Sequence, residues 1–148
     1  MNRRDEPRPD VTNTEQVLRR MEGSGEPIRV KESFQLETLP SLLNRHMGKR
    51  NMSTDALFER IGVNRSFGYR VMNGQRQPGR DVLLSIAFEL ELSYDETQGL
   101  LKVGRVAQLT PREKRDMLIL FCIMHHKPLE EANSLLAERG LLPLTRSI

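Results

Sequence analysis

Apolar side chains recur every three or four positions along most of this 148-residue chain, and that spacing is typical of amphipathic helices. From residue 34 onwards it predicts a series of short helices separated by glycine, proline or capping residues. No stretch shows the two-residue period of a β-strand, and the sequence contains no internal repeat or low-complexity tract. We therefore expect an all-α protein. The helices are predicted over residues 39–47, 53–61, 65–72, 82–90, 95–103, 111–127 and 129–139.

Several helix ends carry capping residues. Asn64 is placed to cap the helix over 65–72, and Asn73-Gly74 is placed to end it, because glycine readily adopts the left-handed conformation after a helix C-terminus. Ser93-Tyr-Asp-Glu96 and Thr110-Pro-Arg-Glu113 both match the capping box, in which the first and fourth side chains each bind a free backbone N–H. We therefore predict helices that begin directly after Ser93 and directly after Thr110.

These elements divide the chain into three parts. Residues 1–33 begin with eleven positions rich in Arg, Asp, Glu and Pro that have almost nothing to bury, and we expect a flexible segment. Residues 13–22 could form a short helix, and the segment either docks on the body or stays loose. Residues 34–103 make up the predicted five-helix body. Residues 104–148 add a C-terminal pair of helices and a short tail.

The C-terminal helix pair has two interpretations. It either packs back on the five-helix body or offers a surface to a partner, most simply a second copy of the chain. We expect the sixth helix to pack inwards, and the seventh helix with the leucine-rich tail to form such an interface. The predicted apolar face of the sixth helix comprises Met117, Leu118, Leu120, Phe121 and Met124, and that of the seventh helix and tail comprises Leu129, Ala132, Leu135, Leu136, Leu141, Leu142 and Leu144.

Positive charge is concentrated in one part of the chain. Residues 60–80 contain five arginines and no acidic residue, so this window carries +5, whereas the whole chain is +3 and the remainder therefore −2. Asp81 follows directly, and we expect it to help cap its own helix. The helices predicted over 53–61 and 65–72 are joined by a glycine turn, and the window runs from the end of the first helix through the whole of the second. A basic face on such a helix-turn-helix is typical of DNA binding.

Composition narrows the other classes of function. Cys122 is the one cysteine of the chain, so an intrachain disulfide is excluded and we expect a cytoplasmic location. No apolar run approaches the ~20 residues of a membrane helix. Cys122 and His126 share a helix face, but zinc usually takes four ligands, and we expect no metal site. The sequence contains no phosphate loop or nucleophile elbow, so we expect neither a cofactor nor an enzyme.

The segment over residues 52–92 resembles the Cro/C1-type (XRE) helix-turn-helix family of phage repressors and bacterial regulators. The resemblance implies a lambda-repressor-like five-helix domain over residues 34–103, in a transcriptional regulator that binds double-stranded DNA. Residues 65–72 would be the recognition helix. The matching positions are Leu57, Ile61, Gly62-Val63-Asn64, Val71, Asn73-Gly74, Pro78, Leu83, Leu84, Ile86, Ala87 and Leu90.

The resemblance also implies roles for individual side chains. In this family the recognition helix enters the major groove N-terminus first, and an arginine there can bind O6 and N7 of guanine. Tyr69 either contacts DNA or packs on a neighbouring helix, and Arg60 is expected to be surface only. The candidates for reading bases are Arg65, Ser66, Tyr69 and Arg70. The candidates for binding phosphate are Thr54, Asn64, Asn73, Gln75, Arg76 and Arg80.

One departure from the family pattern makes a structural prediction. Family members usually carry alanine at the position of Phe58 and a branched aliphatic residue at the position of Gly68. The total volume is roughly kept, which is the exchange that a packed core tolerates best. We therefore predict that the Phe58 side chain lies over Gly68.

A second class of function remains open. Some domains of this fold bind proteins, so the chain could be an interaction module, for example an adaptor or an antitoxin-like component. Such a module would use either the helix-turn-helix or the C-terminal helices to bind its partner.

Overall fold

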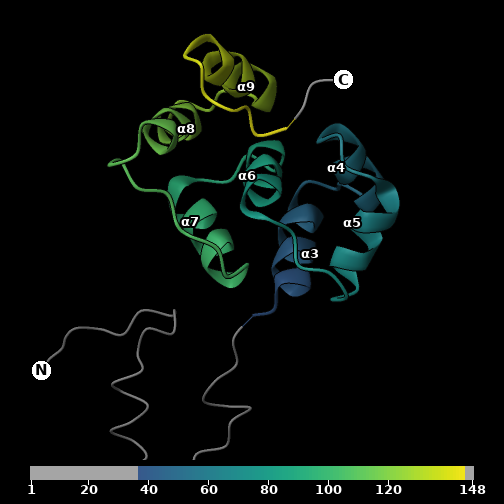
Figure 1. Ribbon diagram of the computed structural model, residues 1–148. Helices are drawn as coiled ribbons and strands as arrows, with labels where there is room; N and C mark the ends of the chain where they lie inside the picture. The colour runs from purple at the N-terminus through teal and green to yellow at the C-terminus, as the bar shows by residue number, and fades with distance from the viewer. Residues whose placement is uncertain (1–36, 146–148) are drawn as a thin grey trace, which may run out of the picture. The chain divides into compact units, whose positions relative to one another are not determined.

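The computed structural model describes residues 37–145 of the chain. The N-terminal segment, with the helix predicted over 13–22, lies outside the described residues. Within residues 37–145 the chain forms helices and no strand, which confirms the all-α prediction (Figure 1). The helices are α3 (Leu39–Lys49), α4 (Thr54–Arg60), α5 (Arg65–Met72), α6 (Arg80–Glu89), α7 (Tyr94–Val103), α8 (Lys114–Met124) and α9 (Leu129–Glu138).

Local capping determines most of the helix ends, as predicted. The Asn64 side chain accepts a hydrogen bond of 2.8 Å from the backbone N–H of Ser66 and so caps α5. Gly74 follows α5 at φ +77° and lets the chain turn away. Ser93 and Glu96 form the predicted capping box of α7, with hydrogen bonds of 3.1 and 2.9 Å. Interactions between residues a few positions apart are sufficient to define these boundaries.

The second predicted capping box is wrong. Helix α8 begins at Lys114, and its N-cap residue Glu113 makes no side-chain capping bond. The backbone N–H of Thr110 instead donates to Oδ2 of Asp116 at 3.0 Å, and the Thr110 hydroxyl accepts from the N–H of Arg112 at 3.3 Å. Asp116 therefore holds Thr110 in a turn that precedes the helix.

One apolar core unites the five-helix body with the C-terminal pair. Helix α6 contacts α4, α7 and α9, and lies in the middle of the described helices (Figure 1). Its residues Leu83, Leu84 and Ile86 are fully buried. On α9, Leu136 is also fully buried and belongs to the same apolar cluster. The C-terminal helices are therefore part of the packed body.

The expected interface on the seventh helix is wrong for the same reason. Leu129, Ala132 and Leu136 of α9 point into the core, and Leu144 of the tail is buried as well. Leu142 is 70% exposed. The apolar stripe of α9 is therefore already covered by the chain itself.

Helix α8 is rotated from its predicted orientation, so that only Leu120 of the predicted inward face is buried and Leu118 is half-buried. Met117, Phe121 and Met124 are 51%, 46% and 63% exposed, although they belong to the face that we expected to pack inwards. The buried residues of α8 are Asp116, Ile119, Leu120, Cys122 and Ile123. Because α8 is apolar on nearly every side, its periodicity does not select one face. The buried Asp116, which must meet a partner, selects the rotation.

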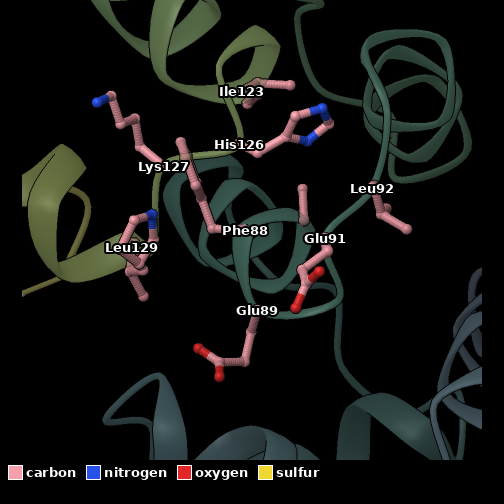
Figure 2. Close-up of a pocket in the computed structure, with 10 residues that line it drawn as sticks. Phe88, Glu89, Glu91, Leu92, Ile123, His126, Lys127 and Leu129 are labelled. Atoms are coloured by element: carbon pink, nitrogen blue, oxygen red, sulfur yellow. The ribbon is translucent and has the colours of Figure 1, made fainter.

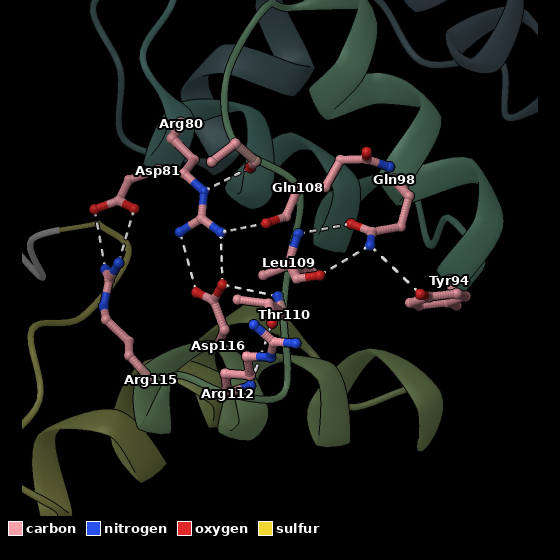
Figure 3. Close-up of polar contacts among 11 residues, drawn as sticks. Arg80, Asp81, Tyr94, Gln98, Gln108, Leu109, Thr110, Arg112, Arg115 and Asp116 are labelled. Atoms are coloured by element: carbon pink, nitrogen blue, oxygen red, sulfur yellow. Dashed lines mark hydrogen bonds and ion pairs between the residues drawn. The ribbon is translucent and has the colours of Figure 1, made fainter. Parts of the chain in front are cut away.

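Reciprocal ion pairs join α6 to α8 (Figure 3). Arg80 binds Asp116 through two hydrogen bonds of 2.8 and 3.1 Å. Asp81 accepts two from Arg115, at 3.0 and 3.1 Å. Such bidentate pairs are among the stronger hydrogen bonds in proteins. Asp81 therefore does not cap its own helix, as we had expected: the N-cap of α6 is Gly79, and no side chain caps it.

Candidate nucleic-acid interface

Helices α4 and α5 pack on each other, and the turn over residues 61–64 joins them. Gly68 and Val71 of α5 are buried. The four candidates for reading bases, which are Arg65, Ser66, Tyr69 and Arg70, are all exposed. These four side chains are therefore free to face a partner, whereas base reading stays a prediction.

The packing of α4 against α5 depends on the exchanged pair of residues. Phe58 is fully buried. A Cβ atom built on Gly68 would lie 2.5 Å from Cγ and 2.6 Å from Cδ2 of Phe58. Those separations are well inside van der Waals contact, so α5 approaches α4 this closely only because Gly68 has no side chain. The prediction that Phe58 lies over Gly68 is confirmed.

An acidic side chain of α4 touches the exposed face of α5. The Tyr69 hydroxyl donates a hydrogen bond of 2.6 Å to Oδ1 of Asp55, and Nε of Arg65 lies 3.8 Å from the same oxygen. This hydrogen bond to Asp55 is the main cause that raises the pKa of Tyr69 above its ordinary value of 10.0. Tyr69 packs on α4 in this way and is still 44% exposed.

Our sequence reasoning missed Asp55. The acid-free window begins five residues later, at residue 60, and that choice of window hid the carboxylate in the first turn of α4. A useful signal was the periodicity of α4 itself. Asp55 precedes Phe58 by three residues, so the two side chains lie on the same side of α4, the side that meets α5.

The loop after α5 carries three of the six candidates for phosphate binding. Asn73, Gln75 and Arg76 are exposed on this loop. The Arg76 guanidinium lies 5.4 Å from the centre of the Phe67 ring, which is a cation–π distance. Gln77 anchors the loop by donating to the backbone carbonyl of Gly104 at 3.1 Å. The loop therefore presents its polar groups from a position that is tied to the body.

The other two candidates on α4 and α5 are at helix starts. Thr54 is half-buried at the first position of α4, and the exposed Asn64 precedes α5. The side-chain oxygen of Asn64 already accepts the N–H of Ser66.

Arg80 does not belong with the phosphate candidates. In addition to its two bonds to Asp116, its Nε donates to the carbonyl of Ala107 at 2.8 Å, and its Nη2 donates to that of Gln108 at 3.2 Å. Four of the five guanidinium N–H groups therefore have partners within the protein (Figure 3). This side chain holds the connector and α8 on the body, and we withdraw it from the DNA-binding candidates.

The five arginines of the basic window thus have different surroundings. Arg80 is committed to Asp116, and Arg60 pairs with Glu89 at 3.5 Å. Among the described residues, no hydrogen bond or ion pair holds the guanidinium of Arg70. The positive charge that remains on the outer face of α5 and its loop comes from Arg65, Arg70 and Arg76.

A cavity of about 240 Å³ lies away from this face, where the end of α6 meets the turn between α8 and α9 (Figure 2). Phe88, Leu92 and Ile123 line it together with the charged Glu91 and Lys127. Its volume is below the roughly 300–1,000 Å³ of small-molecule sites. The charged residues that line the cavity include both acidic and basic side chains.

The part of the chain that the structure describes contains no cluster of side chains suited to binding a metal ion. Across residues 37–145, no three or more His, Cys, Asp or Glu residues are grouped so that they could hold a metal ion. Cys122 is fully buried, and burial raises the pKa of its thiol. His126, in contrast, is exposed.

None of the described helices has the length and apolar character to cross a membrane. Comparison of the chain with protein-family models, curated proteins and solved structures finds no match. The likeness to Cro/C1-type regulators therefore depends on the motif residues of the sequence alone.

Proposed function

We propose that α3 to α7 form a lambda-repressor-like helix-turn-helix domain, and that the protein is a sequence-specific regulator of transcription that binds double-stranded DNA. The observation that carries this proposal is the outer face of α5. There, Arg65, Ser66, Tyr69 and Arg70 are exposed together on a helix whose other face is buried against α4. Such a regulator would act in the cytoplasm.

Helix α5 would lie in the major groove with its N-terminus leading. Arg70 has the freest guanidinium of the face, because no described residue binds it. It can therefore bind O6 and N7 of guanine bidentately, which discriminates against a wrong base by about 1–3 kcal/mol. Arg65 and Ser66 would read the neighbouring base pairs from the first turn.

The loop after α5 would bind the DNA backbone. Arg76 stacks on Phe67, so its charge is held beside the end of the recognition helix. Asn73 and Gln75 add neutral hydrogen-bonding groups on the same loop, and Thr54 adds another at the start of α4. Contacts of this kind set the orientation of a protein on DNA and carry no base information.

Two arginine variants test these assignments, with Arg60→Ala as the matched control. Arg60 pairs with Glu89 and is expected to lie outside the interface. The wild-type protein should bind duplex DNA with an affinity that falls steeply with salt. Arg76→Ala should weaken binding to all sequences alike and reduce the salt slope by about one. Arg70→Ala should lose selectivity by about 1–3 kcal/mol.

Fluorescence anisotropy, with a duplex selected from a random library and with the unselected library, measures both effects. If the Arg70 and Arg76 variants bind like the Arg60 variant, the proposed interface is wrong. If the wild-type protein binds no duplex at all, the DNA-binding function itself is wrong.

A second candidate function, binding of a protein partner, is favoured by the exposed stripe on α8. Met117, Phe121 and Met124 lie at positions i, i+4 and i+7, on one side of the helix. We propose a second copy of the chain as the partner, because a two-fold dimer places the same stripe on both subunits. It would also present two recognition helices to DNA.

Sedimentation over a range of concentrations tests this assembly. Phe121→Glu should shift a wild-type dimer to monomer, whereas Leu142→Glu, at an exposed leucine of the tail, should not. A wild-type protein that stays monomeric at all concentrations would contradict the proposed dimer.

A further inference from the structure

Asp55 places a negative charge against the face that is proposed to approach a polyanion. Its carboxylate contacts two of the four candidates for reading bases, Arg65 and Tyr69. It lies in the first turn of α4, next to the proposed phosphate contact Thr54. A carboxylate in this position opposes binding to phosphate, so its presence there needs a reason.

We propose that Asp55 is a positioning residue that sets the selectivity of the recognition helix. It holds Tyr69 in a defined orientation and offsets the charge of Arg65, so that DNA of unselected sequence is bound weakly. This inference rests on the proposed DNA-binding function. Asp55 acts through its neighbours and need not touch a base.

The two contacts of Asp55 differ in strength. The hydrogen bond from Tyr69 is short, at 2.6 Å, whereas the distance from Oδ1 to Nε of Arg65 is 3.8 Å and the Arg65 side chain is 71% exposed. An exposed pair at that distance is weak and easily exchanged. Arg65 can therefore leave the carboxylate when a correctly placed guanine offers two acceptors.

Selectivity follows from what each kind of DNA offers to Arg65. Binding to unselected sequences comes almost entirely from phosphate attraction, and an arginine that is already paired with a carboxylate adds little to it. At a selected site Arg65 exchanges the carboxylate for base acceptors. There Tyr69, which the short hydrogen bond to Asp55 holds in place, also loses less side-chain freedom on binding. Asp55 thus weakens unselected binding more than selected binding.

Asp55→Asn separates charge from shape. The amide keeps an oxygen that can accept the Tyr69 hydroxyl, but the negative charge is gone. Tyr69→Phe makes the opposite change, because it removes the hydrogen bond and keeps both the ring and the carboxylate. Glu59→Gln is the matched control. It removes the same charge from the same helix, at an exposed residue whose side chain has no hydrogen bond or ion pair within residues 37–145.

The experiment compares the affinity of each folded variant for the unselected duplex library and for a duplex that the wild type selects from it. Asp55→Asn should bind the unselected library about two- to fivefold more tightly, the range expected for an exposed ion pair. Its affinity for the selected duplex should rise less, so that the ratio of the affinity for the selected duplex to the affinity for the library falls. Tyr69→Phe should weaken binding to the selected duplex without tightening binding to the library.

The control variant and the dependence of affinity on salt decide whether the proposal holds. Glu59→Gln should keep the wild-type ratio, and the gain of Asp55→Asn on the library should shrink as salt rises. If Asp55→Asn and Glu59→Gln both keep the ratio of a selective wild type, Asp55 has no role in selectivity and the proposed function stands. If the wild type selects no sequence, the proposed function fails and this inference fails with it.

Discussion

The contact between Phe58 and Gly68 allows a quantitative test of how α4 and α5 pack. The double substitution Phe58→Ala with Gly68→Val puts the small side chain on α4 and the branched one on α5. This is the arrangement that is usual in the family this motif resembles. Phe58 is fully buried, so Phe58→Ala alone should lower the free energy of unfolding by about 3–5 kcal/mol. The loss comes from apolar contacts and from the cavity that remains.

Gly68→Val alone should also destabilise the protein. Its Cβ would lie 2.5 Å from Cγ of Phe58, and the ring has no exposed surface towards which it could move. Overpacking of a filled core costs about 1–3 kcal/mol. Replacing Gly68 by valine also improves helix propensity, but this gain is smaller than the cost of overpacking. A glycine within a helix is only about 1 kcal/mol less favourable even than alanine.

The double variant should be more stable than the sum of the two losses predicts. Valine would fill part of the space that phenylalanine leaves, so the coupling energy should be about 1–3 kcal/mol in the favourable direction. Urea unfolding, followed by the circular dichroism of the helices, measures all four free energies of the cycle.

A remote core residue supplies the control for this cycle. Leu136 on α9 is fully buried as well, and Leu136→Ala combined with Gly68→Val should be additive to within about 0.5 kcal/mol. If Phe58→Ala and Gly68→Val are additive to the same degree, the two residues do not share one space. Our account of the α4–α5 packing would then be wrong.

Two further predictions concern the polar contacts. Asp116→Ala should lower the free energy of unfolding by about 3–5 kcal/mol, because Asp116 is 3% exposed and its loss leaves the guanidinium of Arg80 without its carboxylate; a loss below about 1 kcal/mol in urea unfolding would show that the pair is not structural. Asp55→Ala should lower the pKa of Tyr69 in a spectrophotometric titration, because the hydrogen bond to Asp55 raises it. A Tyr69 pKa that is the same in Asp55→Ala as in the wild type would contradict the hydrogen bond. The stabilisation linked to the raised pKa is present below pH 10.0 and is lost as the pH rises through the folded-state pKa of Tyr69.

Residues close together in sequence determined the helices and the outward face of α5. The Asn64 cap, the turn at Gly74 and the Ser93 capping box each join groups at most a few positions apart. The pairing of Phe58 with Gly68 was predictable from the family resemblance, which implies that the two positions pack together and that the large and small residues have exchanged places.

The tertiary structure alone decided the role of Arg80 and the rotation of α8. The partners of Arg80 lie 27 to 36 residues further along the chain, and nothing local distinguishes this arginine from Arg76. Helix α8 is apolar on several sides, so its own period leaves the buried face open until Asp116 meets Arg80. Local propensity and capping act within about one helical turn, whereas the choice of ion-pair partner and of buried face depends on which segments the folded chain brings together.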